Sequence, residues 1–145
     1  MKISELSIEI VDVPAEDEVF KGFRGVLIRI DDFDLLDLIL SFEKPMLLKE
    51  NRLEIRQMRT WPICRERTKR ILRGYRYYLD GTAPLLDCRC QCEGCWPLDV
   101  QIIRTSTIVK WKNFSNGHRP NWPYAEFGPF HFDRKSYDNE IKKIS

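Results

Sequence analysis

Residues 99–114, DVQIIRTSTIVKWKNF, contain the pattern that decides the fold. Two runs rich in β-branched residues, 99–104 and 107–112, stand on either side of Thr105 and Ser106. Two such runs around a two-residue break predict a β-hairpin, although Thr-Ser is not the Asn-Gly turn that hairpins favour. The sequence therefore predicts an antiparallel sheet.

The residues before this hairpin predict further strands. Residues 3–13, ISELSIEIVDV, alternate apolar and polar side chains, which is the pattern of a half-buried strand. Residues 23–30, FRGVLIRI, predict a second strand, and the acidic stretch 14–19 between the two is expected to be a solvated connection. Residues 52–61 alternate with charged neighbours and predict a third strand with one exposed basic face.

Short helices are expected at three places. Asp34 is a candidate N-cap ahead of the apolar run 35–42, which predicts a buried helix, with a strand as the alternative. A second helix is predicted to begin at Pro62, where a first helical turn tolerates proline, and to end near Gly74. A closing helix is predicted to start after Asp133, its candidate N-cap.

Length and pattern together predict a single α+β domain over residues 1–145, with an antiparallel sheet and a few short helices. The C-terminal stretch 115–130, SNGHRPNWPYAEFGPF, has three prolines and two glycines and is expected to be largely irregular. Its aromatic side chains need burial, so we expect them to cover the hairpin like a lid.

The net charge of +2 hides an uneven distribution along the chain. Residues 1–48 hold 5 Lys and Arg against 11 Asp and Glu, whereas residues 49–78 hold 10 against 3. Tyrosines lie between the arginines of this basic block, which is the composition of a nucleic-acid-binding segment. The chain pI of about 8.3 is low for that function. Pairing with the acidic third of the fold, or binding of an acidic protein partner, is therefore the preferred interpretation.

Two arginines of the basic block, Arg73 and Arg76, are candidate partner contacts. Arg119 and Trp122 of the later loop are the other candidates, because exposed arginine and aromatic side chains anchor interfaces. No stretch approaches the roughly 20 uncharged residues of a membrane span, and the first residues lack the pattern of a secretory signal. We expect a soluble, cytoplasmic protein with reduced thiols or metal thiolates.

Residues 88–98, CRCQCEGCWPL, contain four of the five cysteines. A bend at Gly94 would bring Cys95 back beside Cys88 and Cys90, and zinc takes four ligands of this type in tetrahedral geometry. His118 is the preferred fourth ligand, because it lies in an irregular segment. The sequence thus suggests a Cys3His zinc site. Two alternatives stay open: structurally inert thiols, and redox or nucleophilic cysteines, which need a base and a lowered pKa.

The second half of the chain resembles a family of small, functionally uncharacterised bacterial proteins. The resemblance covers roughly residues 85–141 and rests on C-x-C-x4-CWPL, W-x2-F, H-R-P-x-W-x-Y and GPF-x-F-D-R-x3-Y. The matching positions in this chain are Cys88, Cys90, Cys95, His118, Arg119, Trp122, Tyr124 and Gly128. Cys92 stands where the family has no cysteine, so the resemblance implies three shared thiols. It implies a shared fold and no activity.

Familiar catalytic motifs are missing from the sequence, which has no P-loop, dinucleotide-binding glycine pattern, H-E-x-x-H or nucleophile elbow. We therefore expect a non-catalytic binding or regulatory protein, of the kind that neutralises a partner as immunity proteins do, with zinc in the cysteine-rich turn. A thiol- or metal-dependent enzyme centred on the cysteine cluster is one alternative. Nucleic-acid binding through residues 49–78 is the other.

Overall fold

Two antiparallel sheets carry the fold in the computed structural model, which describes residues 1–18, 20–50, 60–91 and 94–144. The smaller sheet has the order β1 (Leu6–Val13), β2 (Phe23–Ile30) and β3 (Phe33–Asp34). The larger has the order β4 (Trp61–Pro62), β5 (Ala83–Asp87), β6 (Leu98–Arg104), β7 (Ile108–Ser115) and β8 (Phe130–Asp133). The predicted α+β class with an antiparallel sheet is confirmed.

The predicted hairpin is the β6–β7 pair, in which Ile102 lies opposite Trp111. The side chain of Thr105 stabilises the turn between these two strands. Its hydroxyl oxygen accepts a hydrogen bond from the amide of Ile108 at 3.0 Å, and its own amide donates to the Ile108 carbonyl at 2.8 Å. A threonine hydroxyl thus takes the place of the glycine-containing turn that hairpins favour.

Two isolated bridges join the sheets to each other. Ser4, just before β1, pairs with Phe132 of β8, and Gly25 of β2 pairs with Cys64, just after β4. The strands therefore follow one another around a ring, because both edges of the larger sheet meet the smaller sheet. The core inside this ring includes Trp111, which is completely buried.

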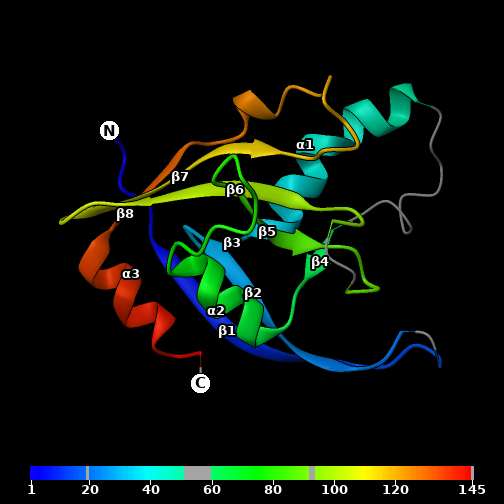
Figure 1. Cartoon of the computed structure of the whole chain (residues 1–145), viewed down its shortest axis with the longest axis horizontal. Helices are drawn as coiled ribbons and strands as arrows, with labels where there is room; N and C mark the ends of the chain where they lie inside the picture. Colours follow the sequence, from blue (N-terminus) through cyan, green and yellow to red (C-terminus); the bar gives the residue numbers. More distant parts are fainter. Residues whose placement is uncertain (19, 51–59, 92–93, 145) are drawn as a thin grey trace.

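Helices begin after both predicted caps, Asp34 and Asp133. Helix α1 (Leu35–Lys49) packs on β2 and β3, and α3 (Arg134–Ile141) packs on β1, β7 and β8 (Figure 1). Asp133 caps α3 by accepting a hydrogen bond from the Ser136 amide at 3.0 Å. Asp34 stands at the N-cap of α1 but makes no cap hydrogen bond, because its carboxylate pairs with Arg29 at 3.2 Å.

Residues of the basic segment form α2 (Arg65–Leu72), within the predicted range, but the predicted start at Pro62 is wrong because Pro62 belongs to β4. Gly74 follows with a φ of +97°, a conformation that favours glycine at a helix end. The predicted third strand spans residues 52–61, of which 52–59 lie outside the described residues; of its two described residues, Thr60 and Trp61, Trp61 belongs to β4. Strand β5 was not predicted, because Pro84 interrupts its short apolar run.

Residues 116–129, which we call the aromatic loop, cover one end of β7 as predicted. Apart from the 3-10 helix η1 (Tyr124–Glu126) this loop is irregular, and it lies above β7 in Figure 1. Phe127 packs edge-on against Phe114 of β7, with ring centroids 4.9 Å apart. Both rings are buried, so the lid contributes to the core.

Candidate metal centre

Residues 88–96, which we call the cysteine turn, are folded by Asp87 at the end of β5. One carboxylate oxygen of Asp87 accepts hydrogen bonds from the amides of Cys88 at 2.8 Å and Trp96 at 3.0 Å. The other accepts from the amide of Gly94 at 2.8 Å. Asp87 is completely buried. A single side chain thus fixes both ends of the turn through the backbone.

Two residues in the left-handed region bend the chain inside the turn. Gln91 has a φ of 62° and Gly94 a φ of 80°. The amide of Gln91 donates to the Cys88 carbonyl at 3.0 Å, and its side-chain nitrogen donates to the Pro62 carbonyl at 3.1 Å. The predicted bend at Gly94 is therefore present, and a second bend at Gln91 shares the reversal.

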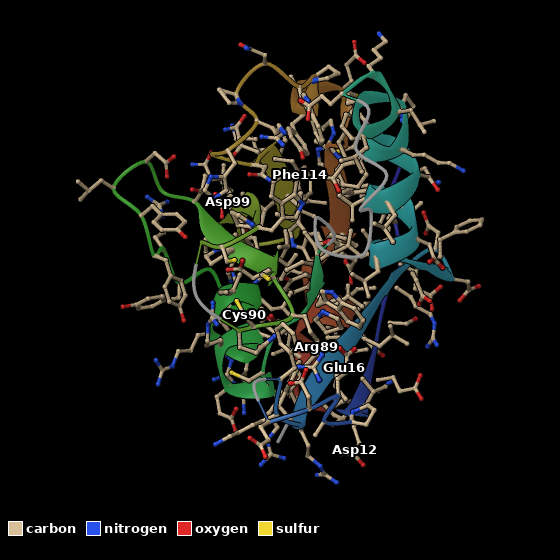
Figure 2. All side chains as sticks on the ribbon, turned by 90° about the vertical axis from the view of Figure 1, so that its right-hand side faces the viewer. Asp12, Glu16, Arg89, Cys90, Asp99 and Phe114 are labelled. Atoms are coloured by element: carbon tan, nitrogen blue, oxygen red, sulfur yellow. The ribbon has the colours of Figure 1, made fainter. Side chains whose placement is uncertain are left out.

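The turn brings three sulfur atoms together. The Sγ atoms of Cys88, Cys90 and Cys95 all lie within 4.8 Å of one another. Figure 2 shows Cys90 beside β5, with sulfur atoms gathered near it. Arg89 lies between Cys88 and Cys90 in the chain and contacts a different part of the fold. The guanidinium of Arg89 donates to the Pro14 carbonyl at 2.6 Å and holds the loop between β1 and β2.

The sulfur spacing fits a tetrahedral zinc ion. Zn–S bonds of about 2.3 Å place two thiolates about 3.8 Å apart. The three sulfurs, now within 4.8 Å, therefore need to approach by about 1 Å at most. Cys88 and Cys90 are half-buried and Cys95 is exposed. Cys92 lies outside the described residues.

The electrostatics of the cluster disfavour a free thiolate. Burial raises the pKa of Cys88, and burial together with the neighbouring thiols of Cys88 and Cys90 raises the pKa of Cys95 to about 12. Each thiolate would repel the others at this spacing, so a divalent cation is the partner that makes three of them compatible. A nucleophilic cysteine needs the opposite shift in pKa.

His118, the predicted fourth ligand, lies beside the turn but outside the sulfur cluster. One of its ring nitrogens, Nε2, forms a hydrogen bond with the Gly94 carbonyl at 3.0 Å. The imidazole stacks on Trp96, with an interplanar angle of 3° and ring centroids 6.1 Å apart. The His118 ring thus contacts the backbone of the cysteine turn. Its Nε2 atom can bind a metal only after this hydrogen bond breaks.

Of the four side chains predicted to bind a partner, two make contacts within the protein and two are exposed. Arg119 forms a salt bridge with Glu50 at 3.2 Å and lies over the rings of Trp96 and Trp122, 5.0 and 5.4 Å from their centroids. The indole nitrogen of Trp122 also donates to Glu50, at 3.3 Å. Arg73 and Arg76 are exposed. Their role in partner binding stays a prediction.

Sequence reasoning missed two buried acids that organise this region, Asp87 and Glu43. Glu43 of α1 is 1% exposed and accepts a hydrogen bond from the Tyr124 hydroxyl. Burial raises the pKa of Glu43 to about 7. The signal was present in the sequence, because Glu43 interrupts the four-residue spacing of the buried Leu35, Ile39 and Leu47. Asp87 had a weaker signal, an acid directly after an apolar run.

No helix within the described ranges is long and apolar enough to cross a membrane. Comparison of the chain with family models, curated proteins and solved structures gave no match. The case for a function therefore rests on the geometry of the cysteine turn.

Proposed function

We propose that this chain is a non-catalytic binding or regulatory protein in which the thiolates of Cys88, Cys90 and Cys95 hold a structural Zn²⁺. The observation that carries the proposal is the spacing of the three Sγ atoms, all within 4.8 Å of one another. Zinc is preferred over harder cations because thiolates are soft ligands, and among the residues that the structure describes the cluster contains cysteines alone.

The proposed role of the ion is to lock the cysteine turn. Asp87 holds the backbone of the turn at Cys88, Gly94 and Trp96, and zinc adds a bond between its two limbs through Cys88 and Cys95. The locked turn presents Trp96, which packs against His118 and Arg119 of the aromatic loop. The metal thus stabilises the platform on which that loop lies. It supplies no reaction step.

Metal analysis of the purified full-length chain tests the proposal. We expect about one zinc per chain, and we expect Cys88→Ser, Cys90→Ser and Cys95→Ser each to weaken zinc binding by about tenfold or more. Cys64→Ser is the matched control, because Cys64 is half-buried but lies outside the sulfur cluster. Zinc near zero in the wild type, with all thiols freely reactive, would falsify the metal site.

Cobalt substitution then identifies the ligands. Thiolate-to-cobalt charge-transfer bands grow with the number of cysteine ligands, so each cysteine variant should lower their intensity. His118→Ala and Cys92→Ser show whether either side chain takes the fourth position, because only a true ligand changes the visible spectrum.

The two alternative functions have less support. An enzyme with a cysteine nucleophile is disfavoured, because the pKa of Cys88 and that of Cys95 are raised. Nucleic-acid binding by the basic block is also less favoured, because some of its arginines already make contacts within the protein. Arg67 donates to the Gln91 carbonyl at 3.3 Å, and Arg65 pairs with Glu66 at 3.1 Å. Both contacts support the cysteine turn or α2 itself.

A further inference from the structure

A cavity of about 580 Å³ lies along β7, where its lining runs from Lys110 to Ser115. Its lining is basic at Lys110 and Lys112 and apolar at Phe127 and Pro129. The cavity lies where the aromatic loop crosses β7, and Figure 2 labels Phe114, another lining residue, in this part of the molecule. Nothing in the metal site uses this surface.

The two lysines lie on the same face of β7. They are two residues apart, and they alternate with Val109 and Trp111, which are completely buried in the core. Both lysines are half-buried, and neither forms a salt bridge with any residue that the structure describes. The cavity therefore carries the positive charges of two lysines against one lining acid, Asp80.

A β-bulge follows Lys112 and places Asn113 at the cavity. Asn113 has a φ of 55°, and the β6–β7 register shifts between Asp99 and Gln101, opposite this residue. The bulge turns Phe114 into the core and leaves Asn113 at the cavity, with its side chain donating to Gln101 at 2.7 Å. Bulges of this kind commonly redirect side chains next to binding sites.

We propose that this surface, formed by Lys110, Lys112, Asn113, Phe127 and Pro129 and called here the lysine face, binds an extended acidic segment of a partner protein. The proposal rests on the binding function proposed above and gives it a surface and a partner chemistry. An extended segment repeats its side chains on one face every 6.6 Å or so, which matches the lysine spacing along β7. Two carboxylates at alternate positions then face Lys110 and Lys112.

The apolar part of the cavity adds a further requirement. A side chain two positions beyond the second carboxylate reaches Phe127 and Pro129, so the preferred pattern is acidic-x-acidic-x-apolar in either chain direction. Asp80 also lines the cavity, and hydrogen bonds from Thr82 keep its pKa low. Its Oδ1 atom already accepts hydrogen bonds from the Thr82 amide and hydroxyl, so Lys110 and Lys112 are the anion-binding groups of the cavity. The apolar lining at Phe127 and Pro129 favours a protein segment over a nucleic acid.

Fluorescence anisotropy on the zinc-loaded full-length chain tests the proposal. The probes are the labelled peptides Gly-Glu-Thr-Glu-Thr-Leu-Gly and Gly-Leu-Thr-Glu-Thr-Glu-Gly, the same peptides with Gln for Glu, and a single-stranded oligonucleotide. We expect saturable binding of at least one acidic peptide, and binding about tenfold weaker for its glutamine version.

Charge reversal locates the binding surface. Lys110→Glu with Lys112→Glu should weaken acidic-peptide binding by about tenfold or more, whereas Lys135→Glu with Lys142→Glu, on exposed positions of and after α3, should change it by less than about twofold. The two double variants change the net charge equally. Lys110→Gln with Lys112→Gln gives the same comparison with a smaller perturbation of β7, and circular dichroism verifies the fold of each variant.

Each remaining outcome overturns the lysine face. These outcomes are no saturable binding of either acidic peptide, equal losses in the two double variants, and preferential binding of the oligonucleotide that depends on Lys110 and Lys112. Zinc content is measured on the same samples. If the protein contains zinc but does not bind the peptide, the lysine face alone is rejected. If the protein takes up no zinc but binds the peptide, the metal site alone is rejected.

Discussion

The cysteine turn and the aromatic loop are both irregular, and each is held by one buried carboxyl group from a regular element. Asp87, at the end of β5, holds the cysteine turn by accepting hydrogen bonds from three backbone amides. Glu43, within α1, holds the aromatic loop through one hydroxyl group, that of Tyr124. The second oxygen of Glu43 has no hydrogen-bond partner among the described residues.

Asp87 therefore fixes the backbone of the cysteine turn, whereas the contact of Glu43 with the aromatic loop is sensitive to protonation. Amide donors satisfy the Asp87 carboxylate without using any side chain of the turn, so its cysteines remain available as ligands. The Glu43 carboxyl is desolvated with one oxygen unpartnered, which raises its pKa to about 7. The turn should therefore depend on the hydrogen bonds that Asp87 accepts, whereas the loop should depend on the charge of Glu43.

Removal of the Asp87 carboxylate should have the largest effect. Asp87→Ala leaves the amides of Cys88, Gly94 and Trp96 without their acceptor, and hydrogen bonds to charged groups are worth roughly 1.5–3 kcal/mol each. Part of this is recovered from water, so we expect the free energy of unfolding to fall by about 3–5 kcal/mol in urea titrations. Zinc binding should fall with it.

Asp87→Asn is the graded control for this prediction. One amide oxygen can still accept from Cys88 and Trp96, but the amide NH2 group faces the Gly94 amide. The loss should therefore be smaller than in Asp87→Ala. A decrease of less than about 1 kcal/mol in Asp87→Ala, no more than an ordinary surface substitution, would contradict the role given to this side chain.

The Glu43 contact should produce a pH-dependent effect of about 3 kcal/mol. The unfolded chain releases this proton near pH 4.5, whereas the folded chain keeps it to about pH 7, so a rise in pH between these values favours unfolding. Glu43→Gln removes the ionisation. Its stability should match that of the wild type below pH 4.5 and exceed it by up to about 3 kcal/mol above pH 7.

Tyr124→Phe should shift the pH range over which stability declines. The Tyr124 hydroxyl lowers the pKa of Glu43 against the effect of burial, so its removal should extend the decline in stability to higher pH. Urea titrations at pH 4.5, 6, 7 and 8 measure both variants. A wild-type stability that does not depend on Glu43 across this range would show that the carboxyl is solvated in solution.

The local patterns of the sequence predicted much of the fold. Alternation over residues 3–13 and the paired runs of the hairpin correspond to β1, β6 and β7, because one side of each strand meets the core. Strand β5 escaped prediction because it is buried along its whole length and therefore shows no alternation. Ring closure through Ser4 and Gly25 depends on pairing between distant segments, which local patterns do not encode.

The clustering of the three cysteines was predictable from the sequence, but the residue that supports the turn was not. The short spacing and the glycine bend indicated that Cys88, Cys90 and Cys95 lie together. The role of Asp87 depends on three amides, two of which are seven and nine residues away along the chain. His118 was predicted to face the sulfurs from its freedom in an irregular segment, but its stacking on Trp96 depends on tertiary packing.

His118 joins the two regions, and its removal should have the smallest effect. The His118 ring contacts the Gly94 carbonyl and Trp96, but the side chain is exposed, so His118→Ala should lower the free energy of unfolding by only about 1 kcal/mol. Hydrogen exchange at Gly94 and Cys95 should quicken, while exchange in α1 should stay unchanged, because Glu43 holds that end of the aromatic loop independently. Faster exchange in α1 as well would mean that the two regions open as one unit, and the distinction between them would then fail.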